Sequence, residues 1–200
     1  VPLHIINGET LRTVDNEGRY KIRLEFGWGG KKDLLDWNFK AELEGGRFVT
    51  IEKCFRGRSV LAPQEGVEVP GDCNVIENRA EIVSETVVEG KVQTAKNANP
   101  TTPATSMVVL EVEGNLDTLL KVNVNGREVE LKLRDCIENS RNYPVGITNS
   151  PAFKIHQLLP SSQYLVKGSF EDECEEASSY WMEIFQKNGS VAFISPVFFR

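Results

Sequence analysis

Apolar and polar residues alternate through much of this 200-residue chain, and this alternation limits its fold more than any other feature. In residues 20–26 and again in residues 37–43, every second side chain is aromatic or aliphatic, and most of those between are charged. A period of two is typical of a strand with one face in a core and the other in water. Together with similar segments at 107–112 and 120–131, it predicts an all-β fold. We expect one antiparallel β-sandwich of about ten to twelve strands with Greek-key-like connections.

Turn signals join these predicted strands. Gly45-Gly46 indicates a tight turn between strands at 37–43 and 47–52. Asn125-Gly126 is a strong hairpin signal, because both residues tolerate a positive φ. The predicted register of that hairpin places Val124 opposite Arg127, Val122 opposite Val129 and Leu120 opposite Leu131. Residues 131–140 carry apolar side chains at helical spacing and predict the one short helix of the fold.

A polar, proline-containing stretch at residues 97–105 divides the chain near its middle. It is compatible with a long loop inside one domain or with an interdomain linker. Neither half has a helical layer to close its own sheet, which favours a single β-sandwich domain over residues 1–200. Two small β domains split near 97–105 are the alternative.

Charge and hydropathy exclude two classes of partner. The chain has 29 acidic and 23 basic residues and a formal net charge of −6, whereas binding to nucleic acid or to an anionic membrane surface needs a basic patch. No stretch approaches the roughly 18 to 20 apolar residues of a membrane-spanning helix. We therefore expect neither a nucleic-acid partner nor a membrane-spanning segment. A first residue other than Met is compatible with a removed signal peptide or an upstream domain.

Motifs for catalysis or metal binding are absent from the sequence. The two histidines, His4 and His156, form no zinc-binding pattern, and His156 is expected on the solvent side with Lys154. The four cysteines (Cys54, Cys73, Cys136 and Cys174) contain no Cys-x-x-Cys pair and allow three disulfide pairings or none. We predict no catalytic residue, no metal site and no cofactor. Calcium at the acidic run 171–176 stays open, although that run lacks the spacing of a calcium loop.

Exposed aromatic residues suggest a carbohydrate-binding alternative. Trp28 lies between glycines in a predicted turn, where its ring could stack on a sugar. The polar groups of Asp33, Asp36 and Arg56 are the candidates for binding the hydroxyls. Trp37 continues the apolar face of a strand and is expected in the core.

The last predicted hairpin is apolar on both faces. Pairing Lys187 with Ser190 across Asn188-Gly189 places Met182, Ile184, Val191 and Phe193 on one face and Trp181, Phe185, Ala192 and Ile194 on the other. Such a strand pair either lies between two layers of its own fold or is covered by a neighbouring domain. The candidate residues for a partner interface are Trp181, Phe185 and Ile194.

Residues 179–198 combine an aromatic strand, an Asn-Gly turn and a hydrophobic strand with a Ser-Pro pair. This pattern resembles the closing hairpin of the accessory C-terminal β region of PHP-type, amidohydrolase-like metal-dependent bacterial hydrolases. Residues 34–47, 54–57 and, more loosely, 152–156 resemble the same region. The His and Asp motifs that bind metal in those hydrolases are absent here, so no catalytic residue is carried over.

Three functions are compatible with the sequence. The resemblance implies a noncatalytic accessory β-sandwich, extracytoplasmic or secreted, that packs on a catalytic hydrolase domain or helps to present its substrate. The first alternative is a carbohydrate-binding module, and the second is a small hydrolase that uses two carboxylates.

Overall fold

A computed structural model of the chain describes residues 16–28, 34–55, 78–95, 105–147, 150–164, 179–185 and 191–198. These residues form antiparallel strands and two short 3₁₀ turns, which confirms the predicted all-β class. The strands are β1 (Glu17–Trp28), β2 (Leu34–Cys54), β3 (Arg79–Ser84), β4 (Val87–Ala95), β5 (Ser106–Val124), β6 (Arg127–Lys132), β7 (Arg141–Pro144), β8 (Ala152–Ile155), β9 (Leu159–Pro160), β10 (Ser179–Phe185) and β11 (Val191–Phe198). The 3₁₀ turns are η1 (Leu133–Cys136) and η2 (Ser161–Gln163).

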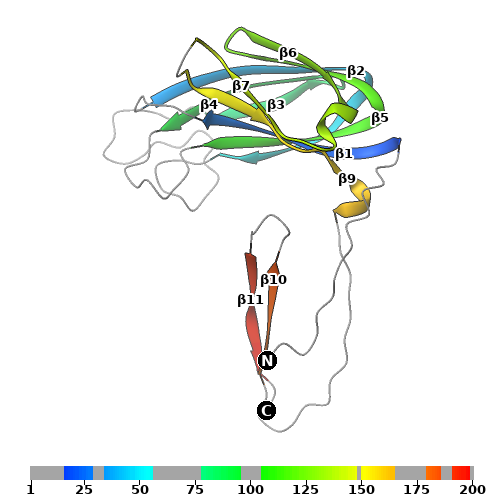
Figure 1. Cartoon of the computed structure of the whole chain (residues 1–200), viewed down its shortest axis with the longest axis vertical. Coiled ribbons are helices and arrows are strands. Elements are labelled where there is room, and N and C mark those ends of the chain that lie inside the picture. Colours follow the sequence, from blue (N-terminus) through cyan, green and yellow to red (C-terminus); the bar gives the residue numbers. More distant parts are fainter. Residues whose placement is uncertain are drawn as a thin grey trace. The chain divides into compact units, whose positions relative to one another are not determined.

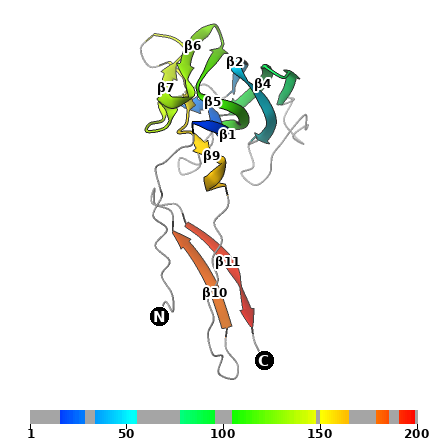
Figure 2. The ribbon, with the colours of Figure 1, turned by 90° about the vertical axis from the view of Figure 1, so that its right-hand side faces the viewer.

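The chain divides into two compact units, Leu11–Leu165 and Val1–Thr10 with Val166–Arg200. In the larger unit, nine strands form one sheet in the order β3-β4-β2-β5-β1-β8-β7, with β6 paired to β5 and β9 to β1. Its strands curve round a common interior (Figure 1). In the smaller unit, β10 and β11 form a separate two-stranded sheet (Figure 2).

The long strands β2 and β5 each take part in both halves of the large sheet. The first part of β2 pairs with β4 and with the end of β5, whereas its last part pairs with the start of β5, which also pairs with β1. The ring of Phe26 on β1 lies 6.0 Å from that of Trp37 and 5.1 Å from that of Phe39, both on the first part of β2. The core therefore lies between two halves of one folded sheet.

The predicted tight turn at Gly45-Gly46 is wrong, because β2 runs through both glycines. The pairing of β2 with β5 shifts register between Glu44 and Gly46, so that Gly45 faces the four residues 115–118 of β5. Gly45 has a φ of +83°, a value that favours glycine. The buried hydroxyl of Thr118 donates a hydrogen bond of 3.0 Å to the carbonyl of Gly45. The glycines thus mark a bend in a continuous strand instead of a reversal of the chain.

The predicted hairpin across Asn125-Gly126 is confirmed with its register. Val124 pairs with Arg127, Val122 with Val129 and Leu120 with Leu131. Asn125 and Gly126 have positive φ angles of 50° and 84°, as a two-residue hairpin turn requires.

The helix predicted over residues 131–140 is wrong in type and length. Strand β6 continues to Lys132, and only the single 3₁₀ turn η1 follows. Leu133 and Cys136 are buried, and their spacing of three fits one 3₁₀ turn as well as an α-helix. The carboxylate of Asp135 accepts a hydrogen bond of 2.9 Å from the N–H of Lys132 and so holds the chain in this turn.

Strands on both sides of residues 97–105 belong to the same sheet, since β4 and β5 both pair with β2. The structure therefore does not divide the chain there; the boundary between its two units falls after Leu165. Among the described residues, all members of the buried apolar cluster lie between Tyr20 and Leu158.

Candidate functional site

The β10–β11 hairpin exposes large apolar side chains. Trp181 is 63 % exposed and Phe193 is 71 % exposed. The other exposed large apolar residues of these two strands are Met182, Ile184, Val191, Ile194, Val197 and Phe198. Glu183 is the one charged residue in 179–185 and 191–198. An apolar surface this continuous is typical of a binding surface, whereas scattered exposed apolar residues are not.

The predicted register of this hairpin is wrong by one residue near the turn, but it holds beyond the bulge, where Tyr180 pairs with Val197 and Ser179 with Phe198. Phe185 pairs with Val191, Ile184 with Ala192 and Met182 with Ile194, whereas the sequence predicts pairs that follow from Lys187 opposite Ser190. A slip of one residue turns every side chain of one strand to the other face of the sheet. Ile194 therefore lies on the opposite face from Trp181, so these two predicted interface residues do not share a face. The side chain of Phe185 and the Asn188-Gly189 turn lie outside the described residues.

With the observed register, the apolar side chains divide between two faces. Trp181, Val191, Phe193 and Phe198 share the first, where the Trp181 indole Nε1–H donates a weak 3.4 Å hydrogen bond to Glu183. Tyr180, Met182, Ile184, Ile194 and Val197 share the second. The pairing shifts between Tyr180 and Met182, so that Ser195 and Pro196 together oppose Trp181 in a β-bulge. Both faces are apolar, as the sequence predicts, although their members differ.

The predicted carbohydrate site is not assembled by the described residues. Trp28 ends β1 and its backbone pairs with Ala152, so its predicted place in a turn is wrong. The Trp28 side chain lies outside the described residues, as do Asp33 and Arg56. Asp36 is exposed on β2, and its Oδ1 accepts a hydrogen bond of 2.9 Å from Gln93 Nε2. Trp37 is buried, as predicted, and donates a hydrogen bond of 2.8 Å to the Thr94 hydroxyl.

A buried polar cluster that the sequence does not predict crosses the start of β5, β1 and the end of β8. Glu25 Oε1 accepts a hydrogen bond of 2.6 Å from the Thr105 hydroxyl, and its Oε2 lies 2.5 Å from His156 Nε2. Arg23 Nη2 lies 2.8 Å from His156 Nδ1. His156 thus lies on the same face as Lys154 and Glu25, as the sequence predicts. Its side chain is, however, partly buried and hydrogen-bonded instead of free in solvent.

The geometry of this cluster determines which nitrogen of His156 carries the proton. A guanidinium can only donate, so His156 Nδ1 accepts from Arg23 and Nε2–H donates to Glu25. Burial by itself would raise the pKa of Glu25. Hydrogen bonds from His156 and Thr105 and the charge of Arg23 outweigh this effect and lower the pKa to about 2. The cluster joins three strands and holds its carboxylate ionised.

Other reactive groups in the described part of the chain offer no assembled site. Cys54 and Cys136 are free thiols, and burial raises the pKa of Cys136 to about 11, which leaves it a poor nucleophile. Within the described ranges, no group of three or more His, Cys, Asp or Glu side chains is placed to hold a metal ion. The acidic run 171–176, with Cys73 and Cys174, lies outside them. Neither 3₁₀ turn that the structure describes is long and apolar enough to span a membrane.

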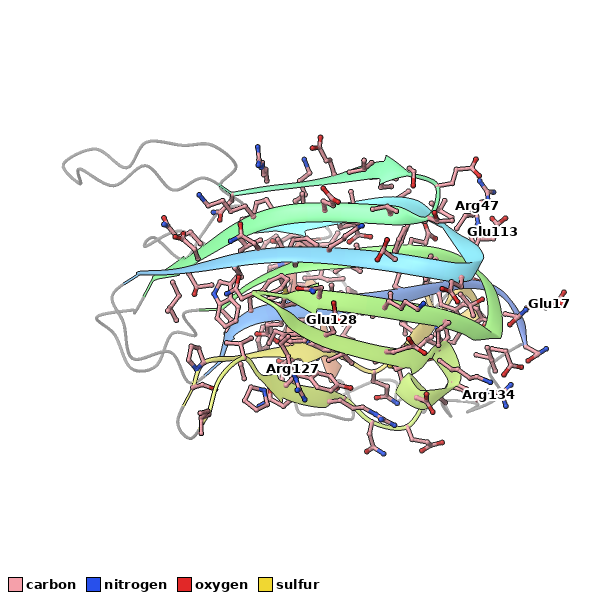
Figure 3. All side chains as sticks on the ribbon, turned by 90° about the horizontal axis from the view of Figure 1, so that it is seen from above. Glu17, Arg47, Glu113, Arg127, Glu128 and Arg134 are labelled. Carbon is pink, nitrogen blue, oxygen red and sulfur yellow. The ribbon has the colours of Figure 1, made fainter. Side chains whose placement is uncertain are left out.

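An open depression of about 590 Å³ lies where β2 and β5 bend. Its floor includes Gly45, Gly46 and Gly114, and its lining contains no aromatic side chain. The guanidinium of Arg47 at its edge binds the carboxylate of Glu113 through two hydrogen bonds of 3.1 and 2.9 Å, and the two side chains point toward each other in Figure 3. The depression therefore has no surface on which a sugar ring could stack, and its arginine is already paired.

No protein-family model matches the chain, and neither a curated protein nor a solved structure gives a significant match. The resemblance to the accessory region of PHP-type hydrolases therefore stays a prediction.

Proposed function

We propose that this chain is a noncatalytic accessory module that docks on a catalytic domain through the β10–β11 hairpin. The observation that supports the proposal is the exposure of apolar side chains on both faces of that hairpin. Burying one Phe, Ile or Met side chain is worth about 1.5–3 kcal/mol, so leaving them in water forgoes a large stabilisation. A two-stranded hairpin alone is also at best marginally stable in water. Both costs disappear when a partner covers the hairpin.

A hydrolase as the catalytic partner rests on the resemblance of residues 179–198, 34–47 and 54–57 alone. In that setting the large sheet of Leu11–Leu165 would be the body of the module and the hairpin its point of attachment. Chemistry would be supplied by the partner, which is consistent with the absence of catalytic motifs from the sequence.

The first experiment measures the mass of the native gene product in its source cells and the shielding of Trp181 within that product. A Trp28→Phe variant leaves Trp181 and the buried Trp37, and acrylamide does not reach Trp37. We expect Trp181 to be readily quenched in the 200-residue chain and several-fold less quenched in a heavier product or complex. A native product near 22.4 kDa that is monomeric, with Trp181 as quenchable as in the isolated chain, contradicts the proposal.

A matched pair of variants separates docking from general surface effects. Phe193→Ser changes an exposed apolar residue of the hairpin, and Val83→Ser changes an exposed apolar residue of β3. Docking predicts that Phe193→Ser alone restores the quenching of Trp181 in the native product. Equal effects of the two substitutions would contradict a role specific to the hairpin.

The carbohydrate-binding alternative has no observation in its favour, because Asp36 is the one candidate whose side chain the structure describes and it is already hydrogen-bonded to Gln93. It stays a prediction. A glycan-binding screen with the Trp28→Ala variant would test it, since the site requires that ring.

A further inference from the structure

The buried polar cluster of Arg23, Glu25, Thr105 and His156 contains one hydrogen bond that depends on the charge of a histidine. The Arg23 guanidinium can only donate, so the 2.8 Å contact from its Nη2 requires a lone pair on His156 Nδ1. A protonated imidazole has an N–H on both nitrogens and no lone pair left to accept. Protonation of His156 therefore turns this hydrogen bond into a contact between two positively charged donors.

The contact of His156 with Glu25 responds in the opposite sense. His156 Nε2–H donates to Glu25 Oε2 at 2.5 Å, and protonation of the ring turns this hydrogen bond into an ion pair. The pKa of Glu25 is about 2, so its carboxylate stays ionised over the range of about pH 5 to 8 in which histidines change charge. The Thr105 hydroxyl, 2.6 Å from Oε1, holds that carboxylate in place. One proton thus breaks one contact of the ring and strengthens the other.

The Arg23 side chain depends on His156 for its place. Among the described side chains, His156 is the hydrogen-bond partner of the Arg23 guanidinium, and Arg23 Nε is buried without a partner. A buried donor without an acceptor costs free energy, which the bond to His156 offsets. Arg19, on the same face of β1, is held differently, because its Nε donates to the carboxylate of Glu113 at 3.0 Å.

The strands beside Arg23 offer it no unoccupied carboxylate among the described residues. The residue opposite Arg23 on β5 is uncharged. Beyond it lie Glu111 on β5 and Glu52 on β2, and both already have partners. Glu111 accepts a hydrogen bond from the Thr50 hydroxyl, and Glu52 binds the Lys21 ammonium. Without His156 as acceptor, Arg23 is therefore expected to turn to water.

The charged groups on the other side of His156 do not replace Glu25 as its partner. Lys154 lies on the same face of β8, and Arg141 on β7 pairs with Ile155 and so shares the opposite face. Glu138 is exposed in the segment 137–140, which accepts a hydrogen bond from Gln157. Within the described ranges, Glu25 is thus the carboxylate that a protonated His156 contacts.

We infer that His156 is a pH-sensitive switch for the Arg23 side chain: the neutral ring holds Arg23, and the protonated ring binds Glu25 as an ion pair and releases Arg23 to solvent. The strands stay paired, because the 2.9 Å bond from the His156 backbone N–H to the Arg23 carbonyl does not involve the ring. Leu24 and Ile155 beside it are fully buried. The inference is independent of the proposed function, since β1 and β8 belong to the larger unit.

Nitrogen-15 NMR of the full 200-residue chain, from about pH 8 to about pH 4.5, tests the inference across the range in which histidines titrate. The ring ¹⁵N shifts of His156 report which nitrogen carries a proton, and the heteronuclear NOE of Arg23 Nε reports the rigidity of that side chain. We expect proton uptake at Nδ1 and loss of the Arg23 NOE with the same midpoint. Arg47 is the matched control, because hydrogen bonds from Arg47 and Arg19 lower the pKa of its partner Glu113. The NOE of Arg47 Nε should therefore stay constant.

Two substitutions separate the roles of the two ring nitrogens. His156→Asn keeps an acceptor near the place of Nδ1 that does not titrate, so Arg23 should stay rigid at every pH. His156→Gln keeps an amide near the place of Nε2 and removes the acceptor for Arg23. In that variant Arg23 should already be as mobile at neutral pH as it is in the acidified wild type.

Four results would overturn the inference. They are a His156 Nδ1 that takes up no proton while the chain is folded, proton uptake with Arg23 Nε still rigid, an Arg23 that is already mobile at the start of the titration, and unfolding of the chain with the midpoint of His156. The backbone amide spectrum reports whether the fold is kept. Acid-induced mobility of Arg23 in His156→Asn would also contradict it, since another group would then be responsible. If either variant fails to fold, the wild-type titration alone decides.

Discussion

Glu25 is a residue whose surroundings in the structure differ from those that the sequence pattern predicts. In the sequence it is one of several charged residues that alternate with the apolar face of residues 20–26, and nothing distinguishes it from a solvent-exposed glutamate. In the structure it is 6 % exposed and hydrogen-bonded to Thr105 and His156. Those partners are 80 and 131 positions away in the sequence, so only the fold brings them together.

We predict that Glu25→Gln lowers the free energy of unfolding at pH 7 by about 1.5–3 kcal/mol, because hydrogen bonds to a buried charge are lost. The pKa of Glu25 is about 2 in the folded chain, whereas its ordinary value is 4.5. The stabilisation that comes from the ionised Glu25 is therefore fully present above pH 4.5. It is lost as the pH falls toward 2. Urea denaturation at several pH values measures this. A difference between wild type and variant that does not shrink in acid would contradict the ionised state of Glu25.

At the scale of the element, the bend shared by β2 and β5 depends on Thr118. This residue is 1 % exposed, donates to the Gly45 carbonyl at 3.0 Å and accepts from the Asn115 N–H at 3.1 Å. We predict that Thr118→Val, which keeps the shape and removes both bonds, lowers the free energy of unfolding by about 1–3 kcal/mol. Thr50→Val is the control, since it replaces an exposed threonine with the same change of shape. Equal losses in urea denaturation would show that the bend does not depend on the Thr118 bonds.

The two Asn-Gly hairpins show what the sequence can and cannot predict about register. Around Asn125-Gly126 the strands are apolar on one face, so the alternation and the turn signal support one register, and that register is observed. Residues 180–198 are apolar on both faces, and a slip of one residue leaves the pattern equally apolar. The sequence therefore predicts a two-faced apolar hairpin but not which side chains share a face. Likewise, Gly45-Gly46 predicts a change of direction, and the sequence pattern does not distinguish a bend from a turn.

At the scale of the whole molecule, the core and the exposed apolar surface belong to different units. The buried cluster lies within residues 20–158 of the larger unit, and the hairpin of the smaller unit carries most of the exposed large apolar side chains of the described residues. This separation is what a docking role requires, because the body must stay folded whether or not the hairpin is covered. The alternation of apolar and polar residues predicts a buried core and an apolar hairpin. That these belong to two different units depends on the fold.

We predict that Phe193→Ser combined with Phe198→Ser leaves the urea unfolding midpoint of the larger unit unchanged, because its core contains neither residue. Fluorescence of the buried Trp37 reports on that unit, and Leu110→Ala, which truncates a fully buried side chain, should cost about 2–5 kcal/mol in the same assay. The double variant should bind less of an apolar dye than the wild-type chain, since two of the most exposed rings are removed. A large shift of the Trp37 transition in the double variant would mean that the hairpin stabilises the larger unit, and the exposed faces would then have an occupant within the chain itself.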